Sequence, residues 1–161
     1  MISQKMTDAI NDQVKAEFES AYLYLAMSAY LETKNLKGMA HWLKQQYKEE
    51  TGHAEKFMEY LQERGARVIL EAIAKPTAEF GTSLDVYKAV LKHERHVTGR
   101  IYKLMDLARE EKDYASQSML TWFIDEQVEE EASAEDIISK LEFLGDSHAS
   151  MYLLDKELGQ R

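Results

Sequence analysis

Two sets of polar residues repeat in this chain at a constant offset of 77 residues. Glu17 is followed 33 residues later by Glu50, which opens a Glu-x-x-His motif that ends at His53. The second half repeats these three positions as Glu94, Gln127 and Glu130. Residues three apart on a helix share a face, and carboxylates with imidazole make a ligand set for metal ions. Two helical hairpins that point such ligands inward are typical of a dinuclear metal site in a four-helix bundle.

Two long helices must position the first set. Apolar residues at spacings of three and four predict a helix from about Gln4 to Thr33, with Glu17 inside its apolar face. Asn35 is the predicted N-cap of the next helix, because its side chain can accept from a free backbone N–H. This second helix is expected to run to about Arg64, and Gly65 suits its C-terminus.

The second set requires another hairpin that begins at the same end of the bundle as the second helix. The segment Ala66–Thr82 contains Pro76 and lacks a sustained helical period, which predicts a long crossover along the bundle. Ser83 is the predicted N-cap of the third helix, and Glu94 lies in the middle of its apolar pattern.

A polar turn near Lys112-Asp113 separates the third helix from the fourth. Gly145-Asp146 is expected to end the fourth helix and to precede a short fifth helix from about Ser147 to Leu158. The predicted fold is all-α: a four-helix bundle with a long crossover between the second and third helices and a short C-terminal fifth helix. At 161 residues the chain is expected to form one domain, residues 1–161.

Composition narrows the possible functions. The net charge is -9, and no block of Lys or Arg is long enough to bind a polyanion, so neither nucleic acid nor a membrane is an expected partner. The chain has no Cys, which excludes disulfides, thiol catalysis and Cys-ligated metals. A cytoplasmic protein is expected, since no signal-peptide pattern precedes the first helix.

Four acidic residues stand at positions where the helices should bury apolar side chains, and their negative charge requires compensation. They are Glu17, Glu50, Glu94 and Glu130. A buried carboxylate without a partner costs several kcal/mol, and four that converge would repel one another. Two divalent cations balance four ionised carboxylates, and His53 adds a neutral ligand. A set rich in oxygen with one imidazole suits iron or manganese better than structural zinc. A bridging Glu50 is the natural arrangement between two metals.

The same residues resemble those of the ferritin family, specifically the bacterial non-haem ferritins, over the whole chain. The resemblance implies one iron held by Glu17, Glu50 and His53, and a second held by Glu50, Glu94 and Glu130. Gln127 matches a hydrogen-bonding glutamine beside this centre, and Tyr24 matches a nearby tyrosine. The resemblance also implies a third iron site, formed by Glu49, Glu126 and Glu129. Glu130 could be shared between this site and the pair.

The family function that the resemblance implies is iron storage with ferroxidase activity. Two Fe(II) ions would bind, be oxidised by O2 or H2O2, and move as Fe(III) into a mineral inside a homo-oligomer of 24 subunits. No haem is expected. Thr51 stands where bacterioferritins carry a haem-ligating Met, and the fourth helix carries Gln127-x-x-Glu130 in place of their Glu-x-x-His.

Several alternatives remain open from the sequence. The bundle could be a di-metal oxidase or peroxidase that stores no mineral, or an interaction protein with a structural metal. Tyr24 is either a functional neighbour of the metals or a core aromatic residue, and core packing is favoured for Trp122. The remaining histidines are expected on the surface or at interfaces, and these are His41, His93, His96 and His148.

Overall fold

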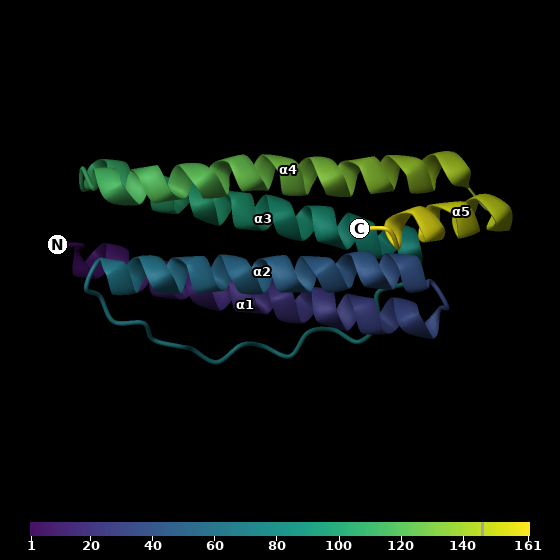
Figure 1. Ribbon diagram of the computed structural model, residues 1–161, viewed down its shortest axis with the longest axis horizontal. Coiled ribbons are helices and arrows are strands. Elements are labelled where there is room, and N and C mark those ends of the chain that lie inside the picture. Colours follow the sequence, from purple (N-terminus) through teal and green to yellow (C-terminus); the bar gives the residue numbers. More distant parts are fainter. Residues whose placement is uncertain (146) are drawn as a thin grey trace.

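The computed structural model describes residues 1–145 and 147–161, and within them the chain forms helices and no strand. Figure 1 shows four long helices aligned along one axis and a short fifth helix at one end. Their bounds are α1 (Gln4–Thr33), α2 (Lys37–Glu63), α3 (Ser83–Glu110), α4 (Tyr114–Leu144) and α5 (His148–Leu158). The predicted all-α bundle with its fifth helix is confirmed. Part of the predicted end of the fourth helix, Asp146, lies outside the described residues.

A long non-helical crossover joins α2 to α3 and follows the length of the α1–α2 hairpin (Figure 1). Gly65 ends α2 with a positive φ of 70°, as glycine at this position allows. The buried Asn11 then holds the start of the crossover, because its amide donates to the Arg67 carbonyl at 3.0 Å and accepts from the Ile69 N–H at 2.8 Å. The crossover therefore brings α3 to the same end of the bundle as the start of α2, as predicted.

Asn35 does not cap α2, so that prediction is wrong. It has a positive φ of 59°, and the bonds from the Asn35 N–H to Glu32 O and from the Leu36 N–H to Leu31 O close the end of α1. The N-terminus of α2 has no side-chain cap from its own N-cap residue. Asp155 of α5 supplies the acceptor instead, at 2.9 Å from the Met39 N–H.

The predicted N-cap of α3 is wrong by one residue, because Thr82 rather than Ser83 takes that position. The Thr82 hydroxyl accepts from the Asp85 N–H at 3.2 Å, and the Asp85 carboxylate accepts from the Thr82 N–H at 2.8 Å. This reciprocal pair is a capping box, which requires an acceptor three residues after the cap. Asp85 has that spacing from Thr82 and not from Ser83.

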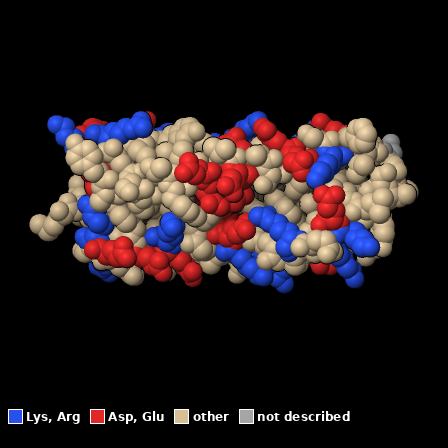
Figure 2. Space-filling view, turned by 45° about the horizontal axis from the view of Figure 1, so that its top comes forward, with Lys and Arg blue, Asp and Glu red and all other residues tan. Residues whose placement is uncertain are grey.

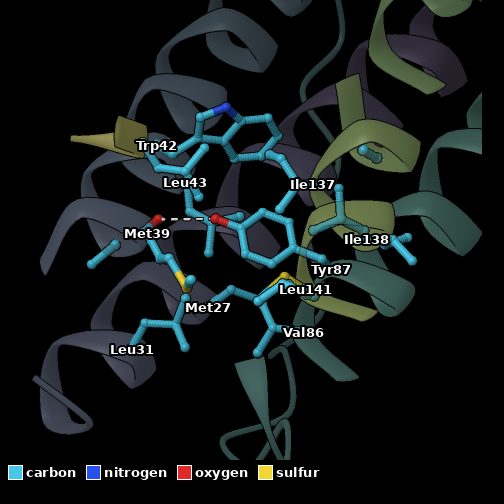
Figure 3. Packing of buried hydrophobic residues seen from close by; sticks show 14 of the residues in the cluster. Met27, Leu31, Met39, Trp42, Leu43, Val86, Tyr87, Ile137, Ile138 and Leu141 are labelled. Atoms are coloured by element: carbon cyan, nitrogen blue, oxygen red, sulfur yellow. Dashed lines mark hydrogen bonds between the residues drawn. The ribbon is translucent and has the colours of Figure 1, made fainter. Parts of the chain in front are cut away.

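The apolar core is divided into two clusters along the bundle. Figure 3 shows the cluster near α5, where Tyr87 packs against Trp42 with ring centroids 5.5 Å apart and lies 3.4 Å from the Met39 carbonyl. The second cluster lies toward the other end and contains the stacked rings of Phe57 and Phe123. Between the two clusters, each long helix carries buried polar residues, and these are Glu17 and Ser20 on α1, Gln46, Glu50 and His53 on α2, Glu94 on α3, and Gln127 and Glu130 on α4.

Charged residues are spread over the outside of the bundle. Figure 2 shows Asp and Glu gathered near the middle of the long axis on one face, with Lys and Arg distributed on both sides of them. Within the described residues, no helix combines the length and the apolar character needed to cross a bilayer.

Candidate metal centre

Each of the four long helices contributes a buried carboxylate to a polar layer between the two apolar clusters. Glu17 comes from α1, Glu50 from α2, Glu94 from α3 and Glu130 from α4, and none is more than 5% exposed. His53 and Gln127, from α2 and α4, are 6% and 3% exposed and share the layer. The helical period puts these residues on inward faces because each replaces an apolar residue at spacings of three or four.

Two groups of side chains could each hold a metal ion. In the first, one ligand atom each from Glu17, Glu50 and His53 lie within 4.8 Å of one another. The His53 Nδ1 is 3.3 Å from Glu50 Oε2. In the second, the same limit joins His53 with Glu126 and Glu130. His53 therefore belongs to both groups, on a helix that also presents Glu50.

Glu17 carries one oxygen with no hydrogen-bond partner. Its Oε1 accepts from Gln13 Nε2 at 2.8 Å, and Gln13 in turn accepts from Arg100 Nε at 2.9 Å. Its Oε2 is buried without a partner, and it is the only such side-chain N or O atom found within the described part of the chain. Buried polar atoms are almost always satisfied, so this oxygen indicates a ligand, and a cation fits a carboxylate.

Glu94 belongs to neither group and is held by neutral donors. It accepts a hydrogen bond from the Tyr24 hydroxyl, and Gln127 Nε2 lies 3.1 Å from its other oxygen. The same amide nitrogen is 3.2 Å from the Glu94 carbonyl, so it holds both the side chain and the helix. Tyr24 and Gln127 thus orient this carboxylate within the layer, and both are themselves buried.

Gln46 also belongs to the layer, and sequence reasoning missed it. Its side chain is completely buried, and its Nε2 donates to Glu130 Oε2 at 2.6 Å. Gln46 precedes Glu50 by four residues, so it lies one turn away on the same face of α2. That spacing is a signal that the sequence offered, but a glutamine there is equally compatible with an exposed position.

Burial raises the pKa values of three carboxyls above the ordinary value for Glu. Removal from water is the main cause for each. It raises the pKa of Glu130 to about 8, with a further contribution from the charge of Glu94. It raises the pKa of Glu94 to about 7, although hydrogen bonds from Tyr24 and Gln127 counteract it. The pKa of Glu50 is raised well above its usual range, and nearby Glu17 and Glu94 add to the effect of burial.

The residues predicted for a third metal site are spread over different environments. Glu126 is half-buried and joins His53 and Glu130. Glu49 is engaged by Arg161, whose Nη2 donates to its Oε2 at 2.7 Å. Glu129 is exposed and belongs to neither metal-ligand group.

Two aromatic residues lie close to this layer, and one of them differs from the sequence expectation. Trp122 is 39% exposed and is therefore not packed in the core as favoured, although its ring lies edge-on to His53 at 5.5 Å. His93, expected on the surface or at an interface, is half-buried and makes contacts within its own chain. Its Nε2 lies 2.7 Å from the Ser20 hydroxyl, and its ring meets Tyr24 edge-on at 5.7 Å. Burial lowers the pKa of His93 to about 4, so the ring is neutral at pH 7.

This arrangement suits the binding of hard divalent cations. It offers anionic oxygen from four helices and one imidazole, and the raised pKa values mean that protons occupy part of the layer without a metal. A bound cation would replace those protons and offset the desolvation of the carboxylates.

Known proteins match this chain over its full length. Residues 7–144 match the ferritin-like domain family. The chain is 42% identical over 161 residues to a bacterial non-heme ferritin of Staphylococcus aureus (strain MRSA252), which covers 100% of this chain and 97% of the relative. It is 44% identical over 161 residues to a bacterial non-heme ferritin of Bacteroides fragilis (strain 638R), with 100% of both chains covered.

Solved structures agree with the sequence relatives. A novel open pore ferritin from the hyperthermophilic archaeon Archaeoglobus fulgidus matches with a TM-score of 0.99 and 45% identity, over 100% of this chain and 99% of that one. An engineered closed form of the same ferritin also matches with a TM-score of 0.99. The chain therefore belongs to the ferritin family, a family of iron-storage proteins.

Proposed function

We propose that the polar layer is a dinuclear ferroxidase centre, which binds two Fe(II) ions and oxidises them with O2 or H2O2. The observation that carries the proposal is the buried, partnerless Oε2 of Glu17 beside Glu50 and His53. No described side chain donates a hydrogen bond to this oxygen, and a cation would complete its coordination.

The two iron ions are the substrates, and different residues would bind each of them. Glu17, Glu50 and His53 would hold the first, while Glu94 and Glu130 would join Glu50 around the second. Carboxylate oxygen favours Fe(III) over Fe(II), because the higher charge gains more from hard anionic ligands. Two Fe(II) ions together supply the two electrons that convert O2 and two protons to H2O2.

Neighbouring residues would hold these ligands in place by hydrogen bonds. Tyr24 and Gln127 keep the Glu94 carboxylate aimed inward, and Gln46 does the same for Glu130. Glu49, Glu126 and Glu129 would hold a third iron close to the pair. Glu126 has the strongest geometric support of the three, because it already lies with His53 and Glu130.

The oxidised iron would be stored as a ferric mineral inside a homo-oligomeric shell of 24 subunits, in the cytoplasm. Ferritin relatives that align over the whole chain, including an open pore form and an engineered closed form, support such an assembly. The lack of Cys fits a reducing compartment.

An anaerobic Fe(II) titration followed by air tests this function. Two tightly bound Fe(II) per chain are expected, and ferric absorbance should develop rapidly when air enters. Oxidation without iron retained in the particle would favour a di-metal oxidase or peroxidase that stores nothing. Tight binding without any oxidation above that of buffer would favour a structural metal and overturn the proposal.

A further inference from the structure

Arg161 occupies a position over the acidic side of the proposed centre. It follows α5 by three residues, beyond the end of that helix, and reaches back to the middle of α2. Its Nη1 donates to Gln46 Oε1, and its Nη2 donates to Glu49 Oε2 at 2.7 Å. One guanidinium thus contacts both a residue that holds Glu130 and a carboxylate that neighbours Glu50.

Further contacts fix Arg161 in this place. Its guanidinium lies over the Trp42 ring, 4.6 Å from the centroid, and its main-chain oxygen accepts from His41 Nε2 at 2.9 Å. The Gln46 amide is oriented by the same contacts, since its oxygen faces Arg161 and its nitrogen faces Glu130. The opposite orientation would set two acceptors against each other at Glu130.

A permanent positive charge at Glu49 must affect cation binding there. Arginine does not lose its proton in proteins, so it cannot make room by becoming neutral. A divalent cation at Glu49 would have to displace the guanidinium or accept its repulsion. The side chain of Arg161 is 31% exposed and lies outside a helix, so displacement requires no helix to unfold.

We propose that Arg161 is a positioning residue that competes with a third cation for Glu49, so that this cation binds only when the guanidinium moves away. The inference rests on the proposed function in that iron is the cation in question. On this inference, Arg161 weakens the binding of a third ion and leaves the binding of the first two largely unchanged. Gln46 contacts both groups, because its oxygen accepts from the Arg161 guanidinium and its nitrogen donates to Glu130.

Titration of the assembled protein with Zn2+ by calorimetry tests this competition without any redox chemistry. Arg161→Met removes the charge and keeps the unbranched stem over Trp42. It should tighten the weakest binding event on the order of fivefold, as expected for loss of a partly exposed ionic contact. The two tighter events should change much less. Arg161→Lys retains the charge and should lie closer to the wild type.

Two further variants make the outcome decisive. Gln160→Ala alters the adjacent residue, which is exposed and bonds only to its own helix turn, and should match the wild type. Glu49→Gln should remove the weakest event and so identify it. An unchanged or weaker third event in Arg161→Met, an equal shift of all three events, or no third event in any protein would overturn the inference.

Failure of the proposed function gives a different result. If the polar layer binds no metal, the two tighter events are missing from every variant. If it binds metal without oxidising iron, all three events remain and only the Fe(II) oxidation assay shows the failure. The remaining event at Glu49 still decides the role of Arg161, because Glu49 lies outside both groups of ligand atoms around His53.

Discussion

The acidic residues of the polar layer differ in what holds them. Glu94 and Glu130 receive hydrogen bonds from neutral donors, whereas one oxygen of Glu17 has none. Glu50 lies beside Glu17 and His53, and its pKa is raised by burial and by its acidic neighbours. A cation shared by Glu50 would offset this cost, in accord with a bridging role between two ions.

Glu50→Gln should slow the fast phase of Fe(II) oxidation by roughly 100-fold. The amide keeps the shape of the side chain but loses the charge that both metals would share, and even indirect support of a metal costs about 10- to 100-fold when removed. Stopped-flow absorbance after mixing with aerobic buffer measures the effect.

Glu55→Gln is the matched control, because Glu55 is exposed on the same helix. This variant should oxidise iron at the wild-type rate. Equal rates for Glu50→Gln and the wild type would refute the bridging role. Slowing in both variants would point to a general effect of charge instead.

Metal binding should release protons, and more of them at low pH. The pKa values of about 7 for Glu94 and about 8 for Glu130 keep both carboxyls largely protonated at pH 6. Binding of Mn2+ should then release roughly two protons or more at pH 6 and clearly fewer at pH 8.5. Calorimetry in buffers of different ionisation enthalpy counts them, and a count independent of pH would contradict the raised pKa values.

The same pKa values set the pH dependence of stability without metal. A carboxyl whose pKa is raised on folding binds more protons in the native state, so stability is greatest below the unfolded value, near 4.5. The unfolding temperature of the metal-free protein should fall as pH rises from about 5 through 8, and bound Mn2+ should reduce this fall. An unfolding temperature that rises over this range without metal would contradict the assignment.

At the scale of elements, α5 caps the N-terminus of α2. The N-terminus of α2 lacks a cap from its own chain segment, and Asp155 of α5 supplies the acceptor for the Met39 N–H. Gly38 allows this approach, because a Cβ built there would lie 1.6 Å from the Asp155 carbonyl oxygen. Leu154 and Leu158 of α5 are buried in the cluster of Figure 3.

Gly38→Ala should displace α5, and Gly52→Ala should not. The overlap at Gly38 involves backbone atoms, so α5 must move, at a cost of about 1–3 kcal/mol. A Cβ at Gly52 meets nothing within 4 Å, so alanine there should stabilise α2 by up to about 1 kcal/mol. Hydrogen exchange of the α5 amides measures the displacement, and that of the α2 amides measures the stabilisation. Full protection of α5 in Gly38→Ala would show that this close contact is not required.

At the scale of the whole molecule, exposed apolar residues lie where the chain passes from α4 into α5. Phe143, Tyr152 and Leu153 are 90%, 69% and 64% exposed. Large apolar side chains that gather on a surface commonly mark contacts between proteins. An 11-residue helix is also marginal on its own, so packing between subunits would support α5.

Leu153→Arg should therefore weaken assembly. A charge placed in an apolar contact loses water without gaining a partner, and light scattering after size exclusion should show a mass below that of the wild type, for which we propose 24 subunits. Lys156→Ala, which changes an exposed charged residue on the same helix, should keep the wild-type mass. A wild-type mass near one chain of 18.6 kDa would refute the assembly itself.

The sequence by itself determined the five helices, the crossover and the inward direction of the acidic residues. Helical periodicity fixes which residues share a face, and the repeat at an offset of 77 marked the same position on two hairpins. These are local properties, because they depend only on the order of residues along one helix. Glu17, Glu50, Glu94 and Glu130 could be assigned to the interior for this reason.

Only the tertiary structure decided which side chains meet across helices. The bond from Gln46 to Glu130, the cap that Asp155 gives to α2, and the contact of Arg161 with Glu49 join residues that are 84, 116 and 112 positions apart. Their formation depends on the relative rotation and axial shift of packed helices. A difference of one turn, about 5.4 Å along a helix, would break each contact and leave the sequence pattern unchanged.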